Sequence, residues 1–181
     1  MGMTYKISSI ALFLFILAGV QAVAAGKRKL TNGTVIAKTE RAVALKAEGV
    51  RVPLELVRKN QSLAERIAKR SSGKSLYVVL KNIQATKQPD GLYHVYLNLE
   101  EGKKPTAAET PVGTINFFNF GGSWEGKTRS DVFFSFNVTE ALNKFVAEKR
   151  LSEPLTVSII PAQQPSEDAA ATIGQIELVE Q

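Results

Sequence analysis

The chain has 181 residues, one histidine, no cysteine and a formal net charge of +6. Without cysteine the protein has no disulfide bonds, thiolate chemistry, cysteine-ligated zinc or iron–sulfur clusters, so its stability has to come from the burial of apolar side chains. His94 has no second histidine with which to form a metal site.

The positive charge lies in the first part of the chain. Residues 27–74 carry thirteen Lys and Arg against four Glu, a net charge of +9, whereas residues 75–181 carry nine basic and thirteen acidic residues, a net charge of −4; Lys6 completes the total. The basic part contains no Phe, Tyr or Trp on which nucleic-acid bases could stack. It predicts a solvated or anion-facing surface and no nucleic-acid partner.

Residues 1–24 are typical of a secretory signal peptide. Lys6 precedes an apolar run over residues 10–20, and the small residues Ala22 and Ala24 suit signal peptidase. The run is shorter than the roughly 20 apolar residues that span a bilayer. A retained membrane anchor is the alternative, because weak apolar character continues through Ala25. Cleavage after Ala24 leaves residues 25–181 as a single domain, secreted or periplasmic, with no membrane contact.

Short strands are expected over residues 34–37, 41–45 and 50–54, followed by an amphipathic helix within residues 55–70. The apolar side of this helix holds Leu56, Leu63 and Ile67, and the remaining positions are mostly basic. Such a helix could dock on an anionic membrane surface, but its apolar side has no Trp or Phe. We favour a helix lying across one end of a β domain.

A central strand is expected over residues 75–83, because apolar residues occupy both of its faces. Residues 88–91, Gln-Pro-Asp-Gly, predict a turn that returns the chain over residues 92–99 as an antiparallel hairpin partner. In the returning strand His94 falls on the more polar face. A third strand, residues 111–118, follows a polar loop.

Residues 119–131 form a glycine-rich loop with the only tryptophan, Trp124. Within it, GGSWEGKT (residues 121–128) matches the phosphate-loop pattern letter for letter. A phosphate loop has to open a helix, whereas strand-like residues 132–136 follow Thr128, so we interpret the match as chance. Trp124 is either an exposed contact or a cover for the end of the sandwich, and we favour the cover.

The last third of the chain predicts one helix and two strands. Asn137 and Glu140 form a capping pair for the helix. Strands follow at residues 155–160 and 172–179, where Ile173 is out of phase unless Gly174 lies in a bulge. The whole pattern predicts an all-β fold, a jelly-roll-like β-sandwich that is mainly antiparallel, with one or two short helices at its ends.

Five segments carry a family resemblance by their order and spacing: YHVYLNL (93–99), VGTINFF (112–118), FNVTEAL (136–142), LTVSIIP (155–161) and IGQIEL (173–178). Together they resemble the C-terminal, non-copper β domain of the tyrosinase and polyphenol oxidase family. Residues 42–54 are similar to the entry strands of that domain. The resemblance implies a β domain that packs over the copper-site entrance of its own enzyme, limits substrate access and sometimes assists maturation.

This chain departs from that family in its histidines. The family's type 3 dicopper centre takes six histidine ligands, and this chain has only His94. Its carboxylates are also scattered rather than paired in one cleft. We therefore expect no catalytic residue, no metal, no cofactor and no enzyme activity. Any shielding has to act in trans, on a separately encoded tyrosinase-like copper oxidase.

The candidates for contact with such a partner are four aromatic residues: Phe118, Phe120, Trp124 and Tyr96. An alternative function is an extracellular glycan- or ligand-binding module. That function requires an aromatic platform or a concave sheet face lined by Tyr96, His94 and Trp124.

Overall fold

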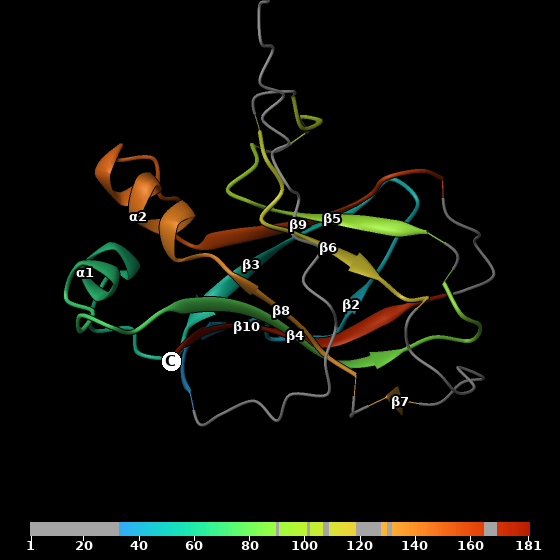
Figure 1. Ribbon diagram of the computed structural model, residues 1–181, viewed down its shortest axis with the longest axis horizontal. Helices are drawn as coiled ribbons and strands as arrows, with labels where there is room; N and C mark the ends of the chain where they lie inside the picture. Colours follow the sequence, from blue (N-terminus) through green and yellow to red (C-terminus); the bar gives the residue numbers. More distant parts are fainter. Residues whose placement is uncertain are drawn as a thin grey trace, which may run out of the picture.

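The computed structural model describes residues 33–89, 91–100, 102–106, 109–118, 128–129, 132–164 and 170–181. Within these ranges all strand pairings are antiparallel, and ten strands form one nearly closed sheet (Figure 1). The elements are β1 (Thr34–Lys38), β2 (Val43–Ala44), β3 (Val50–Leu56), α1 (Leu63–Ala68), β4 (Leu76–Gln84), β5 (Leu92–Leu97), β6 (Gly113–Asn116), β7 (Thr128–Arg129), β8 (Phe134–Asn137), α2 (Thr139–Ala147), β9 (Leu155–Pro161) and β10 (Thr172–Glu180).

The sheet bends into two layers. Its strand order is β6-β5-β9-β3-β1-β10-β4-β7, with β2 beside β10 and β8 beside β4. Strand β3 joins the layers, because residues 50–54 pair with β9 and residues 55–56 pair with β1. Figure 1 shows α1 and α2 together at one end of the sheet. The predicted all-β, mainly antiparallel sandwich with short helices at its end is confirmed.

Aromatic rings from both layers meet in the core. Phe117 contacts Tyr93 and Phe134 edge to face, with ring centroids 5.9 Å and 5.6 Å apart. Phe117 itself is fully buried. Edge-to-face aromatic pairs add stability beyond the area that they bury. These contacts hold the layer containing β5 against the layer containing β8.

The predicted hairpin between residues 75–83 and 92–99 is wrong. Residues 75–83 do lie in a central strand, but β4 pairs with β10, β7 and β8, while β5 pairs with β6 and β9. A turn sequence specifies a change of direction and not a partner. β10, like β4, has nine residues, so it satisfies more of the β4 backbone than the six-residue β5 could.

The first helix is shorter than predicted. Residues 55–56 belong to β3, where they pair with Lys38 and Ala37 of β1. α1 begins at Leu63, and its N-cap Ser62 accepts a hydrogen bond at Oγ from the Glu65 N–H at 3.1 Å. An apolar residue such as Leu56 fits a strand as well as a helix, and the strand pairing decides. Leu63 and Ile67 are buried, as the helical pattern predicts.

Strand β10 changes face without the predicted bulge at Gly174. Its register against β4 is constant from Thr172 to Glu180, yet Ile173 and Ile176 are both fully buried. The register places Gly174 opposite Asn82, which has a φ of +55°. A Cβ on Gly174 would lie 2.8 Å from the Asn82 Cβ. Because Gly174 has no side chain, there is room opposite it for Asn82 in its left-handed backbone conformation. This conformation shifts the inward–outward alternation of side chains by one position.

The cap of α2 agrees with the sequence in part. Asn137 Oδ1 accepts a hydrogen bond from the Thr139 N–H at 3.0 Å, as expected for a residue that satisfies the first turn. The N-cap position is Val138, however, one residue later than predicted. Leu142 is fully buried, so its side of α2 faces the core.

Several predictions lie outside the described residues: the signal peptide, the contact candidates Phe120 and Trp124, and most of the phosphate-loop match. Its final residue, Thr128, is described and lies in β7, which pairs with β4. Thr128 therefore does not open a helix, in agreement with a chance match. Among the described residues no helix is long and apolar enough to span a bilayer.

Candidate functional site

The outer side of strands β6, β5 and β9 carries the main exposed apolar surface. On β5, Tyr93 and Val95 face the core, so Leu92, His94 and Tyr96 face outward. The same alternation turns alternate residues of β6 and β9 outward. We call this surface the β5–β6 face and define it by Leu92, His94, Tyr96, Thr114, Phe118 and Ile160.

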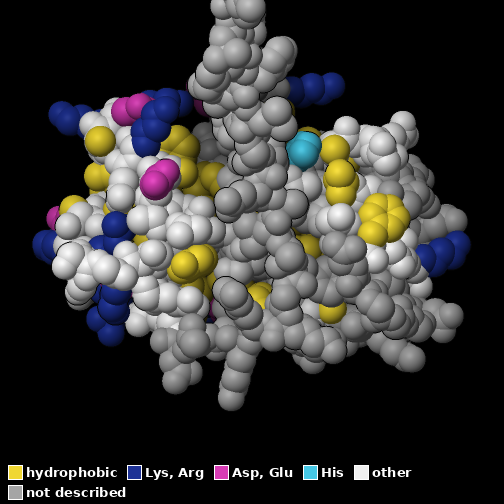
Figure 2. All heavy atoms as spheres, in the orientation of Figure 1, with side chains coloured by type: hydrophobic (Ala, Val, Ile, Leu, Met, Phe, Trp, Pro, Cys, Tyr) yellow, Lys and Arg dark blue, Asp and Glu magenta, His cyan; other side chains and the backbone are white. Residues whose placement is uncertain are grey.

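Two large apolar side chains stand exposed on this face. Phe118 is 55% exposed and Leu92 is 37% exposed. Elsewhere in the described part of the chain, only Val57, between β3 and α1, is comparable. Figure 2 shows apolar side chains gathered beside the single histidine. Grouped exposed apolar side chains mark an interaction surface more often than single ones do.

A local turn fixes the position of Phe118. The Phe118 N–H donates to Asn116 Oδ1 at 2.9 Å, which holds the chain just beyond the end of β6. Asn116 pairs with Leu92 across the two strands. Phe118, two residues farther on, therefore lies just beyond the end of β6, at the Leu92 end of β5.

His94 is held by neighbours on the sheet. Its Nδ1 lies 3.1 Å from Thr114 Oγ1, within hydrogen-bond distance. Its ring contacts Tyr96 edge to face, with centroids 6.4 Å apart. Among the described residues no group of three or more His, Asp and Glu side chains could hold a metal ion. On this geometry His94 is a polar residue of the β5–β6 face, held by Thr114 and Tyr96.

Tyr96 faces outward but is only 7% exposed. Burial raises the pKa of its hydroxyl group above the ordinary value of 10.0, and the negative charge of Glu109 raises it further. Its cross-strand neighbour on β9 is Ser158, which is also buried. Little of the Tyr96 ring is therefore available to a partner.

Two of the four predicted contact residues, Phe118 and Tyr96, lie among the described residues, but the register places them toward opposite ends of β5. Only Phe118 is substantially exposed. Sequence reasoning missed Leu92 and Ile160. Their signal was present, because both are apolar residues at outward positions of strands whose other face is fully apolar.

The fold and this surface define a class: an antiparallel β domain that presents aliphatic and aromatic side chains on one sheet face, with no metal-binding group in its described part. More particularly, the chain belongs to the family described as a domain of unknown function (DUF7868), whose model matches residues 32–181. No curated protein matches the chain.

Solved structures with a similar fold are polyphenol oxidases. A recombinant latent aurone synthase (polyphenol oxidase) matches with a TM-score of 0.45 and 16% identity, over 78% of this chain and 25% of that chain. Latent apple tyrosinase matches with a TM-score of 0.40 and 14% identity, over 79% of this chain and 26% of that chain. This chain thus spans about a quarter of their length. They come from the family that the five sequence segments resemble, as predicted.

Proposed function

We propose that the chain is a non-catalytic, secreted or periplasmic interaction domain whose β5–β6 face binds a separately encoded tyrosinase-like copper oxidase. Bound there, it shields the entrance to the copper site or assists maturation of the oxidase in trans. The observation that carries this proposal is the exposure of Phe118 and Leu92, two large apolar side chains at the same end of the β5–β6 face.

The energetics of this face favour a protein contact. Each exposed side chain that a partner covers contributes about 25 cal/mol per Å² of apolar surface removed from water. Aromatic anchors at the centre of an interface often dominate its affinity. The neighbouring His94 and Thr114 add polar groups at the border of the apolar pair.

The class of partner comes from the resemblance of the five sequence segments to a domain that lies over a type 3 copper site. A single histidine supplies one of the six ligands that such a site takes, so the proposal assigns the copper to the partner. The proposed role of this chain is to control access to it.

A glycan- or ligand-binding module is the second candidate. The presence of His94 and Tyr96 on one sheet face favours this function. A sugar ring needs an open aromatic face on which to stack, however, and Tyr96 is 7% exposed. The burial of Tyr96 makes protein binding the better supported of the two.

The test is binding to a copper oxidase recovered from the native secreted or periplasmic fraction. The chain, tagged at its C-terminus, is used to capture partners, and diphenol oxidase activity is assayed with and without it. We expect it to retain a copper oxidase and change its activity. The double variant Leu92→Ser and Phe118→Ser should weaken the binding at least tenfold, because it removes both exposed anchors.

Val57→Ser is the matched control, since Val57 is 52% exposed and lies outside the β5–β6 face. It should bind like the unaltered chain. Thermal unfolding of all variants checks that the fold is retained. Equal binding by the double variant and the control would contradict the assignment of this face. Failure to retain any oxidase would overturn the proposal, and a glycan array would then test the second candidate.

A further inference from the structure

Positive charge gathers at the end of the molecule that holds α1 and α2. Residues 58–74 carry six Lys and Arg against one Glu, and Figure 2 shows Lys and Arg side chains over this end. We call these six cations the basic end and define it by Arg58, Lys59, Arg66, Lys69, Arg70 and Lys74. None of them belongs to the β5–β6 face. The basic end is therefore independent of the proposed oxidase contact.

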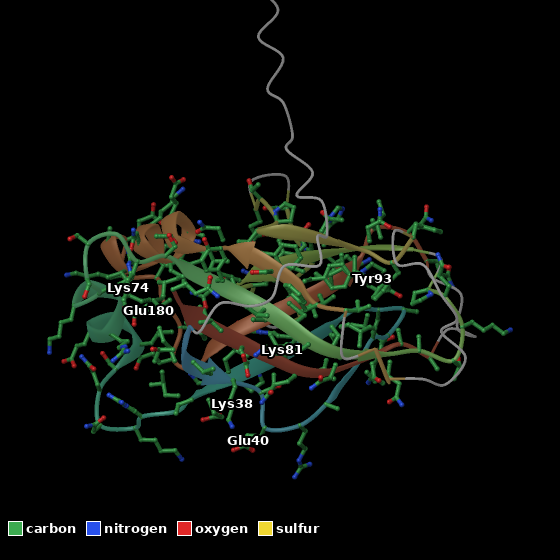
Figure 3. The ribbon with its side chains drawn as sticks, turned by 60° about the horizontal axis from the view of Figure 1, so that its bottom comes forward. Lys38, Glu40, Lys74, Lys81, Tyr93 and Glu180 are labelled. Carbon is green, nitrogen blue, oxygen red and sulfur yellow. The ribbon has the colours of Figure 1, made fainter. Side chains whose placement is uncertain are left out.

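Nearby carboxylates neutralise only part of this charge. Arg66 Nη2 lies 3.1 Å from Glu180 Oε2, and Lys74 Nζ lies 3.9 Å from Glu180 Oε1. Two cations thus share one buried carboxylate; Figure 3 shows Lys74 and Glu180 beside each other. Among the described residues the other four cations make no ion pair.

The remaining acidic groups do not cancel the excess. Glu65 lies within α1, and Glu153 accepts a hydrogen bond from the Ala64 N–H at 3.3 Å. With these two and Glu180 counted, the basic end keeps a net charge of +3. The neighbouring residues 139–150 carry three cations and two Glu, so α2 adds to the positive charge.

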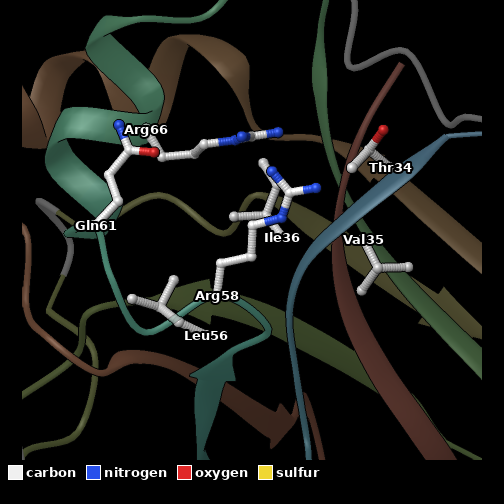
Figure 4. A pocket seen from close by; sticks show the side chains of 7 residues that line it. All are labelled: Thr34, Val35, Ile36, Leu56, Arg58, Gln61 and Arg66. Atoms are coloured by element: carbon white, nitrogen blue, oxygen red, sulfur yellow. The ribbon is translucent and has the colours of Figure 1, made fainter.

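The cations without ion pairs lie at the surface. Arg58, Lys59 and Lys69 are exposed, while Arg70 is half-buried and donates from Nη1 to Asn143 Oδ1 on α2 at 3.4 Å. Figure 4 shows Arg58 and Arg66 extending into the same region from two different elements. The hollow that they line has a cavity volume of about 20 Å³, room for one water molecule. A partner of this end therefore lies over the surface and is not enclosed by a pocket.

The side chains around the basic end discriminate between kinds of anionic partner. A nucleic acid would stack its bases on aromatic rings, and residues 58–74 contain none. An anionic lipid surface would take up apolar side chains, and within the described residues Val57 is the one large apolar side chain exposed beside Arg58. Exposed amide and hydroxyl groups lie among the cations instead: Asn60, Ser71, Ser72 and Asn143.

Cations interleaved with amides and hydroxyls match the groups of an acidic sugar chain. Guanidinium and ammonium groups pair with its carboxylates, while Asn amides both donate to and accept from its hydroxyl groups. We propose that the basic end binds a linear acidic polysaccharide that lies across α1. This site lies beyond the oxidase-binding function and does not depend on it.

The test is a titration of fluorescently labelled oligogalacturonate with the unaltered chain, followed by anisotropy. We expect binding that weakens as salt is added, because salt screens exposed charges. Polyglutamate with the same number of carboxylates should bind about fivefold more weakly, since it has no hydroxyl groups for the amides. Absence of oligogalacturonate binding would overturn the site. Equal affinity for polyglutamate, or tighter binding to vesicles containing phosphatidylglycerol, would overturn the polysaccharide assignment.

The double variant Lys59→Gln and Lys69→Gln should weaken the binding about tenfold, because it removes two exposed cations that have no ion pair. Lys38→Gln with Lys46→Gln is the matched control, since both lysines are exposed, lie outside the basic end and change the net charge equally. It should bind like the unaltered chain. Thermal unfolding checks that both variants keep the fold. Equal affinities of the two double variants would overturn the assignment to the basic end.

Discussion

Ser158 is buried on the outer side of β9, and its hydroxyl has no hydrogen-bond partner among the described residues. A buried hydroxyl group without a partner costs about 1–3 kcal/mol. We therefore expect Ser158→Ala to raise the free energy of unfolding by about 1 kcal/mol, measured by denaturant titration.

Ser152→Ala serves as the contrasting variant. Its Oγ donates to Asn98 Oδ1, so its removal should lower the free energy of unfolding. If Ser158→Ala also lowers the stability, the Ser158 hydroxyl makes a bond in solution, and its description as unpartnered is wrong.

The raised pKa of Tyr96 predicts that the folded chain loses stability in alkaline solution. Burial, and then the charge of Glu109, raise the pKa of Tyr96 in the folded chain above its ordinary value of 10.0. The unfolded chain therefore releases this proton at a lower pH than the folded chain does. The contribution is fully present below pH 10 and is lost as the pH rises through the raised pKa.

Denaturant titrations at a series of pH values measure this loss. The free energy of unfolding should fall less steeply above pH 10 in Tyr96→Phe than in the unaltered chain, because Phe has no proton to release. Superimposable pH profiles for the two chains would show that the environment of Tyr96 does not disfavour the phenolate.

Among the strands, β6 can pack closely against β8 because Gly113 in β6 has no side chain. A Cβ at Gly113 of β6 would lie 2.0 Å from Cδ1 of Phe136 in β8. Added volume in a packed core displaces its neighbours and costs about 1–3 kcal/mol. We expect Gly113→Ala to lower the free energy of unfolding by that amount.

The reason is tested by a double-mutant cycle. Phe136→Leu removes the ring that the new methyl group meets, so the combined variant should lose less stability than the sum of the two single changes. Simple additivity would place the effect of Gly113→Ala in the β6 backbone instead of the contact with Phe136.

Local patterns in the sequence predicted most elements but not their partners. Alternation along residues 92–99 gave the inward positions Tyr93, Val95 and Leu97, which lie in the core. Pairing β4 with β10 joins segments almost a hundred residues apart, which no turn signal encodes. The face change in β10 depends on the left-handed backbone of Asn82 in another strand. Such features require knowledge of which strands are neighbours.

The candidate surface was likewise predicted in part. Phe118 follows a strand that ends beside a loop, and this local signal placed it at an exposed position. Tyr96 occupies an outward position, yet it is buried. Alternation tells which side of a strand a residue faces, but not what covers that side. The basic end needed α1 and α2 to be brought together before Arg70 could be seen beside Asn143.

For the molecule as a whole, β10 is the central connection. It lies between β1 and β4, so both of its edges are hydrogen-bonded. Just beyond it, Gln181 and Ser75 exchange two backbone hydrogen bonds of 2.7 Å and 2.9 Å. We expect a chain ending at residue 171 to remain unfolded, because β1 and β4 would each lose a partner.

A synthetic peptide of residues 172–181 should restore folding when it is added to the shortened chain. Far-ultraviolet circular dichroism and amide NMR dispersion report the recovery. A peptide with the same residues in scrambled order is the control, since it lacks the register with β4. A shortened chain that is already folded without peptide would show that β10 is dispensable.

The central place of β10 also has a consequence for biosynthesis. A ribosome delivers a chain from its first residue onward, so β1 and β4 emerge well before the strand that lies between them. Until then the nascent chain carries two open strand edges that can pair with other nascent chains. Closure of the sheet has to wait for translation of residues 172–180, so this domain cannot complete its fold progressively during synthesis.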